Sequence, residues 1–199
     1  MEGEYTTSDE KRWVEQAKQG NGAAFAQLYT HYERQIHAHI YRMMGNADDA
    51  SDLTQDTFLK AYKGLVNTAP DLNVSAWLYR IAHNACMDQL RRQQRVRWQP
   101  WDVQKHDDLL HVSAEDHPER AALRQEVGTV VQRVLDHMSP INRAALVMRE
   151  YDALGLDEIG LALGKSRSAM KSILFRAREE FRKISVEMGL DAPLEDDDL

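Results

Sequence analysis

The sequence predicts an all-α protein made of two small helical domains joined by an acidic linker. Apolar residues recur at helical spacing almost throughout, and no stretch alternates apolar and polar residues as a half-buried strand does. The period fails over residues 99–118, which hold five carboxylates against one lysine and end in a proline. We therefore expect helical domains at 1–98 and 119–188, followed by an acidic, disordered tail at 189–199.

Four helices are expected in the first domain, with bounds at about 7–19, 23–44, 48–65 and 74–95. An apolar stripe from Phe25 to Met43 runs along the second helix, which Gly45 ends. The third helix turns Phe58 inward. Cys86 belongs to the apolar stripe of the fourth helix, where we expect the thiol to pack as a small hydrophobic group.

Four more helices are expected in the second domain, at about 119–138, 140–151, 156–163 and 167–188. Ser139 and Pro140 suit the N-cap and the first helical position of one of them. Gly164 ends the short helix, and the long basic helix begins after Ser166. A short helix, a glycine turn and a basic helix together outline a helix-turn-helix.

The last helix concentrates positive charge in a chain that is acidic overall. Residues 165–183 hold seven basic and two acidic side chains, whereas the whole chain holds 25 basic and 32 acidic ones. Such a helix can neutralise phosphates and reach base edges in the major groove. A solvated face of an ordinary bundle helix would carry the same charges, but the short helix and Gly164 favour DNA binding. The outward residues expected are Ser168, Lys171, Ser172, Phe175, Arg176 and Arg178, with Arg167 adding charge at the start.

A second basic cluster ends the first domain, where arginines alternate with aromatic residues. Aromatic rings beside arginines suit unstacked bases and a single-stranded backbone. Most of the Trp77 ring is expected in the core, so the spacing alone is weak evidence. The cluster comprises Arg80, Arg91, Arg92, Arg95 and Arg97, interleaved with Trp77, Tyr79 and Trp98.

Composition argues against a membrane protein and against the common enzyme motifs. No apolar run approaches the roughly 18 residues of a membrane span, and the N-terminal segment is too polar for a signal peptide. There is no phosphate-binding glycine loop and no nucleophile elbow. His106, His111 and His117 lie among the linker carboxylates, but no other ligand spacing supports a metal site. With a lone cysteine as well, we expect a cytoplasmic protein that is not an enzyme and needs no cofactor.

Three motifs, in this order, resemble a group IV (extracytoplasmic-function, ECF) sigma factor of the sigma-70 family of bacterial RNA polymerase. DDASDLTQDTFLKAYKGL resembles region 2.2, SAWLYRIAHNACMDQLRR resembles regions 2.3 and 2.4, and LDHMSPINRAALVMREYDALGLDEIGLALGKSRSAMKSILFRAR resembles region 4. The resemblance implies binding to core RNA polymerase, recognition and opening of the promoter, and initiation of transcription. The partners implied are the clamp helices of the largest polymerase subunit, the flap of the second, promoter DNA and, in some members, an anti-sigma factor.

The resemblance also implies roles for individual residues. Clamp docking would involve Asp49, Asp52, Gln55, Asp56 and Phe58. A specificity loop at 67–74 and the helix after it would read the −10 element through Asn67, Asn73, Trp77, Arg80, Asn84, Asp88, Arg91 and Arg92. The −35 element would be contacted by Arg149, at a phosphate, and by Arg167, Ser168, Lys171, Ser172, Phe175, Arg176 and Arg178.

The sequence departs from the usual pattern of this family at two places, and a second class of protein would share part of it. The specificity loop reads NTAPDLNVS, without the Gly and Phe usual around its tip, and Ile173 stands where many members have arginine. The resemblance therefore predicts no particular promoter sequence. An operator-binding helix-turn-helix regulator that acts without polymerase would explain the second domain, but it would leave residues 48–97 without a purpose.

Overall fold

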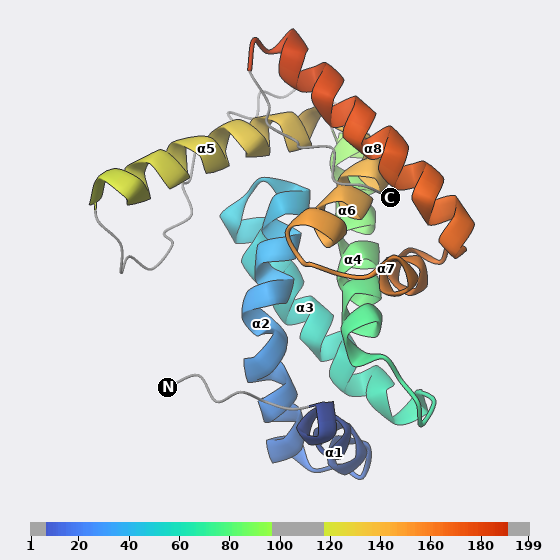
Figure 1. Cartoon of the computed structure of the whole chain (residues 1–199). Coiled ribbons are helices and arrows are strands. Elements are labelled where there is room, and N and C mark those ends of the chain that lie inside the picture. Colours follow the sequence, from blue (N-terminus) through green and yellow to red (C-terminus); the bar gives the residue numbers. More distant parts are fainter. Residues whose placement is uncertain (1–6, 97–117, 191–199) are drawn as a thin grey trace.

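The computed structural model describes residues 7–96 and 118–190, which form helices and short connections with no strand (Figure 1). Each helix begins and ends within one residue of its expected bounds, so the all-α prediction is confirmed. The residues between 97 and 117 and beyond 190 lie outside the described part, with most of the expected linker and tail. The elements are α1 (Thr7–Lys18), α2 (Gly22–Met44), α3 (Ala47–Gly64), the 3-10 turn η1 (Leu65–Asn67), α4 (Val74–Val96), α5 (Pro118–His137), α6 (Pro140–Glu150), α7 (Leu156–Leu163) and α8 (Arg167–Glu187).

In the first half, α1–α4, the helices α2, α3 and α4 pack on one another and α1 packs on α2 (Figure 1). The expected apolar stripes face inward, because Ile36, Ile40 and Met43 of α2 are fully buried. Cys86 of α4 is also fully buried, and burial raises the pKa of its thiol to about 12. Cys86 is therefore a core residue, as expected, and not a reactive thiol.

In the second half, α5–α8, the helix α8 packs against α5, α6 and α7. Leu135, Leu146 and Phe181 belong to the buried cluster that joins α5, α6 and α8. Glu180 of α8 accepts hydrogen bonds from the Ser139 N–H at 2.7 Å and from the Ser139 hydroxyl at 2.9 Å. Ser139 is the N-cap of α6, as expected, but this glutamate satisfies its backbone N–H and so holds α8 against the start of α6.

The two halves are packed together and share one apolar core. In the chain as described, α7 lies against α4, and α5 and α6 lie against α2 (Figure 1). Ile40 from the first half and Met148 and Ile159 from the second belong to the same buried cluster. Helical periodicity shows which face of a helix is buried but not which helix covers it, so this interface could not be predicted from the sequence.

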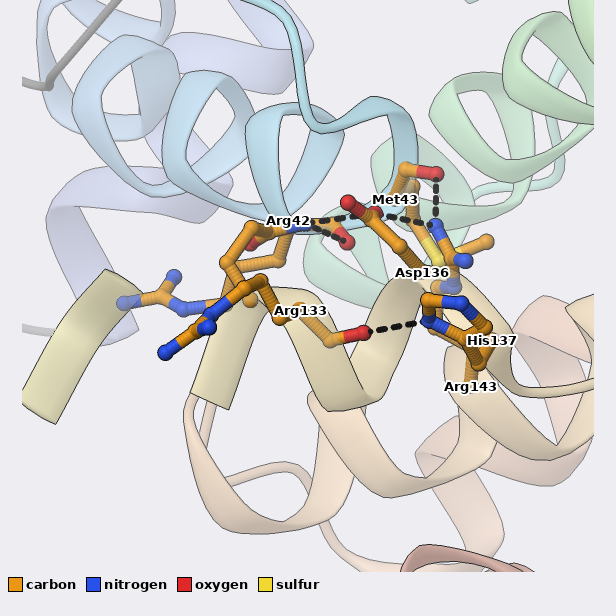
Figure 2. A network of polar contacts seen from close by, with 7 residues as sticks. Arg42, Met43, Arg133, Asp136, His137 and Arg143 are labelled. Carbon is orange, nitrogen blue, oxygen red and sulfur yellow. Dashed lines mark hydrogen bonds and ion pairs between the residues drawn. The ribbon is translucent and has the colours of Figure 1, made fainter. Parts of the chain in front are cut away.

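Polar groups along this interface are also matched across the two halves. The Arg143 guanidinium donates to the carbonyl of Met43 at 2.7 Å and lies 3.4 Å from the Asp136 carboxylate (Figure 2). Gln132 donates to the carbonyl of Arg42 at 3.2 Å. The carbonyls near the end of α2 are thus satisfied by side chains of α5 and α6.

Gly45, which ends α2, is required at this contact. Its φ of 68° is left-handed, and an added Cβ would lie 2.9 Å from a carboxylate oxygen of Asp136. Any larger residue would both strain the turn and push α5 away. The glycine therefore serves the helix stop, as the sequence predicted, and also the close approach of the second half.

A buried histidine–aspartate pair crosses the same interface. His39 Nδ1 of α2 lies 2.8 Å from Asp152 Oδ2, which follows α6, and the two side chains are 0% and 4% exposed. The Tyr79 ring of α4 packs edge-on against the His39 ring at 5.1 Å. Burial first, and the Asp152 carboxylate second, raise the pKa of the Tyr79 hydroxyl.

Candidate nucleic-acid and partner interfaces

The helix-turn-helix of α7 and α8 is confirmed and is built around a close glycine contact. An added Cβ at Gly160 would lie 2.8 Å from the carbonyl oxygen of Lys165, so α7 can approach the turn only with glycine there. Gly164 ends α7 with a φ of 64°. The Ser166 hydroxyl accepts a hydrogen bond from the Ala169 N–H at 3.3 Å and begins α8.

The outward face of α8 is the one that the sequence predicted. Met170, Ile173, Leu174 and Ala177 are buried, whereas Arg167, Ser168, Lys171, Ser172, Phe175 and Arg176 are exposed and Arg178 is half-buried. The Phe175 ring is 63% exposed. A large aromatic ring in water among basic residues suits contact with a base or a sugar.

The positive side chains of this face differ in whether they form ion pairs within the described part of the chain. Arg167 pairs with Asp157 at 2.5 Å, and Arg178 pairs with Glu150 at 3.0 Å. In contrast, Lys171 and Arg176 make no ion pair with any residue of the described ranges. These two side chains can therefore bind an anion without first breaking an internal pair.

Arg149, the expected phosphate contact, lies at the exposed end of α6 near this face. Its guanidinium donates to the carbonyl of Leu154 at 3.2 Å, in the connection between α6 and α7. One hydrogen bond leaves most of its five N–H donors available. Arg149 therefore holds the connection between α6 and α7, and its other donors stay available for the expected phosphate contact.

The expected −10 residues of α4 form one exposed row. Arg80, Asn84 and Asp88 follow one another at intervals of four residues, and all are exposed, as are Arg91 and Arg92. Asp88 pairs with Arg91 at 2.9 Å. The Trp77 ring is half-buried and packs against the core, as expected. The side chain of Arg95, and Arg97 and Trp98, lie outside the described part of the chain.

The loop before α4 is anchored at both ends. Asn67 is exposed in η1, and Asn73 is the residue before α4, where its side chain accepts from the Ala76 N–H at 2.8 Å. The Asn73 amide also donates to Glu158 of α7 at 3.4 Å. Asn73 therefore shapes the start of α4, and α7 brings a carboxylate beside it.

The acidic residues of α3 divide into an exposed set and a structural one. Asp52, Gln55 and Asp56 are exposed on one face. Asp49 instead accepts hydrogen bonds from Gln89 at 3.1 Å and Gln93 at 3.0 Å, which join α3 to α4.

Phe58 also belongs to the interior rather than to the exposed face. It is 3% exposed, and its ring lies 4.7 Å from the Tyr29 ring. The resemblance placed Phe58 among the docking residues, but in this chain its side chain supports α3 from inside. A motif match cannot separate the two roles, because both keep the residue apolar.

Sequence reasoning missed an apolar stripe beside the exposed carboxylates. Leu59, Tyr62 and Val66 are 56%, 53% and 61% exposed, at intervals of three and four residues along α3 and η1. The signal was available, because these apolar residues lie on the face opposite the buried stripe of the same helix. Together with Asp52 and Asp56 they give α3 an outward face that is acidic at its start and carries apolar side chains beside the exposed Lys60 and Lys63 at its end.

Nothing in the described residues points to a metal centre or a membrane span. No group of three or more His, Cys, Asp or Glu side chains in that part of the chain could hold a metal ion. His39 is engaged with Asp152, and the linker histidines His106, His111 and His117 lie outside the described ranges. Among the helices of those ranges, none is long and apolar enough to cross a membrane.

Comparison with known proteins gives matches over both halves. Residues 28–96 match the sigma-70 region 2 family, and residues 129–181 match the sigma-70 region 4 family. The ECF RNA polymerase sigma factor SigE of Mycolicibacterium smegmatis is 31% identical over 193 residues, which cover 90% of this chain and 72% of the relative. The ECF RNA polymerase sigma factor SigW of Bacillus subtilis is 30% identical over 177 residues, which cover 87% and 95%.

Solved structures show the same fold at lower identity. CnrH, solved in complex with the cytosolic domain of CnrY, matches with a TM-score of 0.68 at 23% identity, over 92% of this chain and 99% of that one. The sigma factor RpoE of Bartonella quintana, solved with the anti-sigma factor NepR, matches with a TM-score of 0.64 at 19% identity, over 84% and 98%.

Proposed function

Because the chain belongs to the ECF group of the sigma-70 family, we propose that α3 docks it on core RNA polymerase while α4 and α8 read the promoter. A sigma factor binds core polymerase and directs it to promoter DNA. The region 2-like domain at 1–98 would dock and read the −10 element, and the region 4-like domain at 119–188 would read the −35 element. The protein would act in the cytoplasm and make no bonds itself, since the polymerase supplies the chemistry.

The observation that carries this proposal is that the chain presents two exposed faces of opposite character. The outward face of α8 offers Lys171 and Arg176, which form no ion pair with the residues that the structure describes and so suit phosphates and guanine edges. The outward face of α3 offers Asp52 and Asp56 followed by apolar side chains, which suits a basic and apolar protein surface. An operator-binding regulator needs the first face, but it gives no role to the second.

The packing of the two halves implies that the protein opens on a promoter. Helices in contact have axes about 8–10 Å apart, and α7, which precedes the −35 helix, is in contact with α4. The −10 and −35 elements are about 25 base pairs apart, or about 85 Å at about 3.4 Å per base pair. Both elements of one promoter can therefore be bound only after the interface between the halves has separated.

Charge reversal on α3 tests the docking role. In Asp52→Arg with Asp56→Arg, positive charges replace the carboxylates that would face basic groups of the polymerase. Co-purification with core polymerase should fall by about tenfold or more, while circular dichroism and the melting temperature stay close to wild type, because both side chains are exposed.

The matched control is Glu15→Arg with Glu33→Arg, which reverses two exposed charges on α1 and α2. This control should bind core polymerase like the wild type. Unchanged binding of the α3 variant, or equal loss in both variants, would contradict the assignment of α3.

A further inference from the structure

Lys18, the last residue of α1, reaches across to the loop before α4. Its ammonium donates to the carbonyl of Thr68 at 2.9 Å and to the carbonyl of Ala69 at 2.8 Å. The side chain is half-buried, and it forms no ion pair with a carboxylate of the described residues. A charged ammonium that binds two successive carbonyls holds them more firmly than a neutral donor would.

The rest of the loop is held at its two ends. Thr68 bonds back to the carbonyl of Leu65 through its hydroxyl at 2.7 Å and its N–H at 3.1 Å. At the other end Leu72 packs on the core, and Asn73 caps α4. The tip between these anchors, Ala69 to Asp71, is exposed, and the Lys18 ammonium is the group from another helix that the structure shows bonded to it.

The two hydrogen bonds also fix the direction of a backbone donor. The peptide unit between Thr68 and Ala69 is planar and trans, so its N–H points opposite to the carbonyl that faces Lys18. The Ala69 N–H is therefore directed away from α1, and it has no hydrogen-bond partner among the residues that the structure describes. Pro70 follows with no N–H and a restricted φ, which limits the ways in which the tip can rearrange.

We infer that Lys18 is a positioning residue for base recognition, because it holds the specificity loop at 67–74 in one shape through the carbonyls of Thr68 and Ala69. This inference rests on the proposed function, in which that loop receives a base of the −10 element. Lys18 lies on α1, outside the residues 28–96 that match the region 2 family. The base preference of this sigma factor thus depends on a helix beyond the matched region.

The test uses Lys18→Met, which keeps the length and apolar stem of the side chain but removes its donors. Lys11→Met, an exposed lysine on the same helix, is the matched control, and Lys18→Arg restores charge and donors. Holoenzyme formed with each variant is assayed for open-complex formation on promoters that carry each of the four bases at each −10 position. Core affinity, melting temperature and discrimination at −35 are measured beside it.

Lys18→Met should lower discrimination at the −10 position that the loop reads by about tenfold, the scale of one lost charge-assisted contact. Discrimination at −35 and core affinity should not change. Lys11→Met should match the wild type, and Lys18→Arg should recover part of the loss. Wild-type discrimination in Lys18→Met, or an equal loss at −10 and −35, would overturn the inference.

Hydrogen exchange of the free protein supplies a second readout that needs no promoter. The Thr68 amide, which donates to the Leu65 carbonyl at 3.1 Å, should exchange faster in Lys18→Met than in Lys11→Met, because the loop loses its contact with α1. Equal exchange in the two variants would overturn the positioning role directly. A wild-type protein that does not bind core polymerase would instead contradict the proposed function, so the two failures are distinguishable.

Discussion

Replacing Asp152 with alanine would leave His39 buried without its hydrogen-bond partner. The two side chains meet at 2.8 Å and are 0% and 4% exposed, and His39 Nε2 has no hydrogen-bond partner within residues 7–96 and 118–190. Removing one member of a buried pair costs about 3 kcal/mol or more, because the remaining polar group stays out of water. We therefore expect Asp152→Ala to lower the free energy of unfolding by about 3 kcal/mol.

Urea unfolding followed by circular dichroism measures this loss, with Asp157→Ala as the matched control. Asp157 is five residues further along the chain and forms an exposed pair with Arg167, so its loss should cost less than about 1 kcal/mol. The double variant His39→Phe with Asp152→Ala should be more stable than Asp152→Ala alone, because no buried polar ring remains unpaired. The phenylalanine ring would also keep the packing against Tyr79.

The comparison of the two aspartates decides whether the halves pack together in solution. If Asp152→Ala and Asp157→Ala cost the same small amount, His39 is not buried against Asp152 in the free protein. The packing of α7 on α4 would then not be its resting arrangement, and the need to open on a promoter would disappear. A large loss in Asp152→Ala, partly recovered in the double variant, confirms the interface.

Two further predictions concern DNA reading and acid stability. Arg176→Ala should weaken holoenzyme binding to the correct −35 element by about 1–3 kcal/mol and to a scrambled element much less. Arg182→Ala should weaken binding to both elements alike and flatten the salt dependence of binding. Binding to both promoters is measured across a salt series, and an equal effect of Arg176→Ala on both would show that α8 supplies charge without reading sequence. Burial first, and the nearby His39 and Arg91 second, lower the pKa of His83 to about 4. As the pH falls below about 6.5, protons therefore bind His83 in the unfolded chain before they bind it in the folded protein. The free energy of unfolding should therefore fall by about 3 kcal/mol between pH 6.5 and 4. Urea unfolding at several pH values should show a smaller fall in His83→Gln. If the free energy of unfolding of His83→Gln depends on pH as steeply as that of the wild type, the role of His83 is contradicted.

The helices could be predicted from the sequence because their signals are local. Apolar spacing predicted that Met170, Ile173 and Leu174 lie on the buried face of α8, and turn residues such as Gly45 and Gly164 indicated where helices end. The outward face of α8 followed from the same spacing, since the residues left over after the apolar stripe are the exposed ones. A single helix contains all the information needed for each of these inferences.

Contacts between distant segments could not be predicted in this way. His39 and Asp152 are 113 residues apart, and Lys18 and Thr68 are 50 apart, so neither pair leaves a pattern in one helix. Asp49 shows the related difficulty: the resemblance implied a docking role for it, and the structure adds a structural one, because its carboxylate accepts hydrogen bonds from two glutamines of α4. Whether a polar side chain serves the fold or a partner depends on what packs beside it.

The packing of the two halves against each other affects the two proposed DNA-binding faces differently. The outward residues of α8 remain exposed, so the surface proposed for the −35 element is accessible in the free protein. The start of α4 instead has Glu158 of α7 beside Asn73, which places a carboxylate near the surface proposed for the −10 element. A carboxylate there repels the phosphates of an approaching strand. Separation of the halves removes that charge from the −10 loop, so weakening the His39–Asp152 pair should favour the −10 interaction more than the −35 interaction.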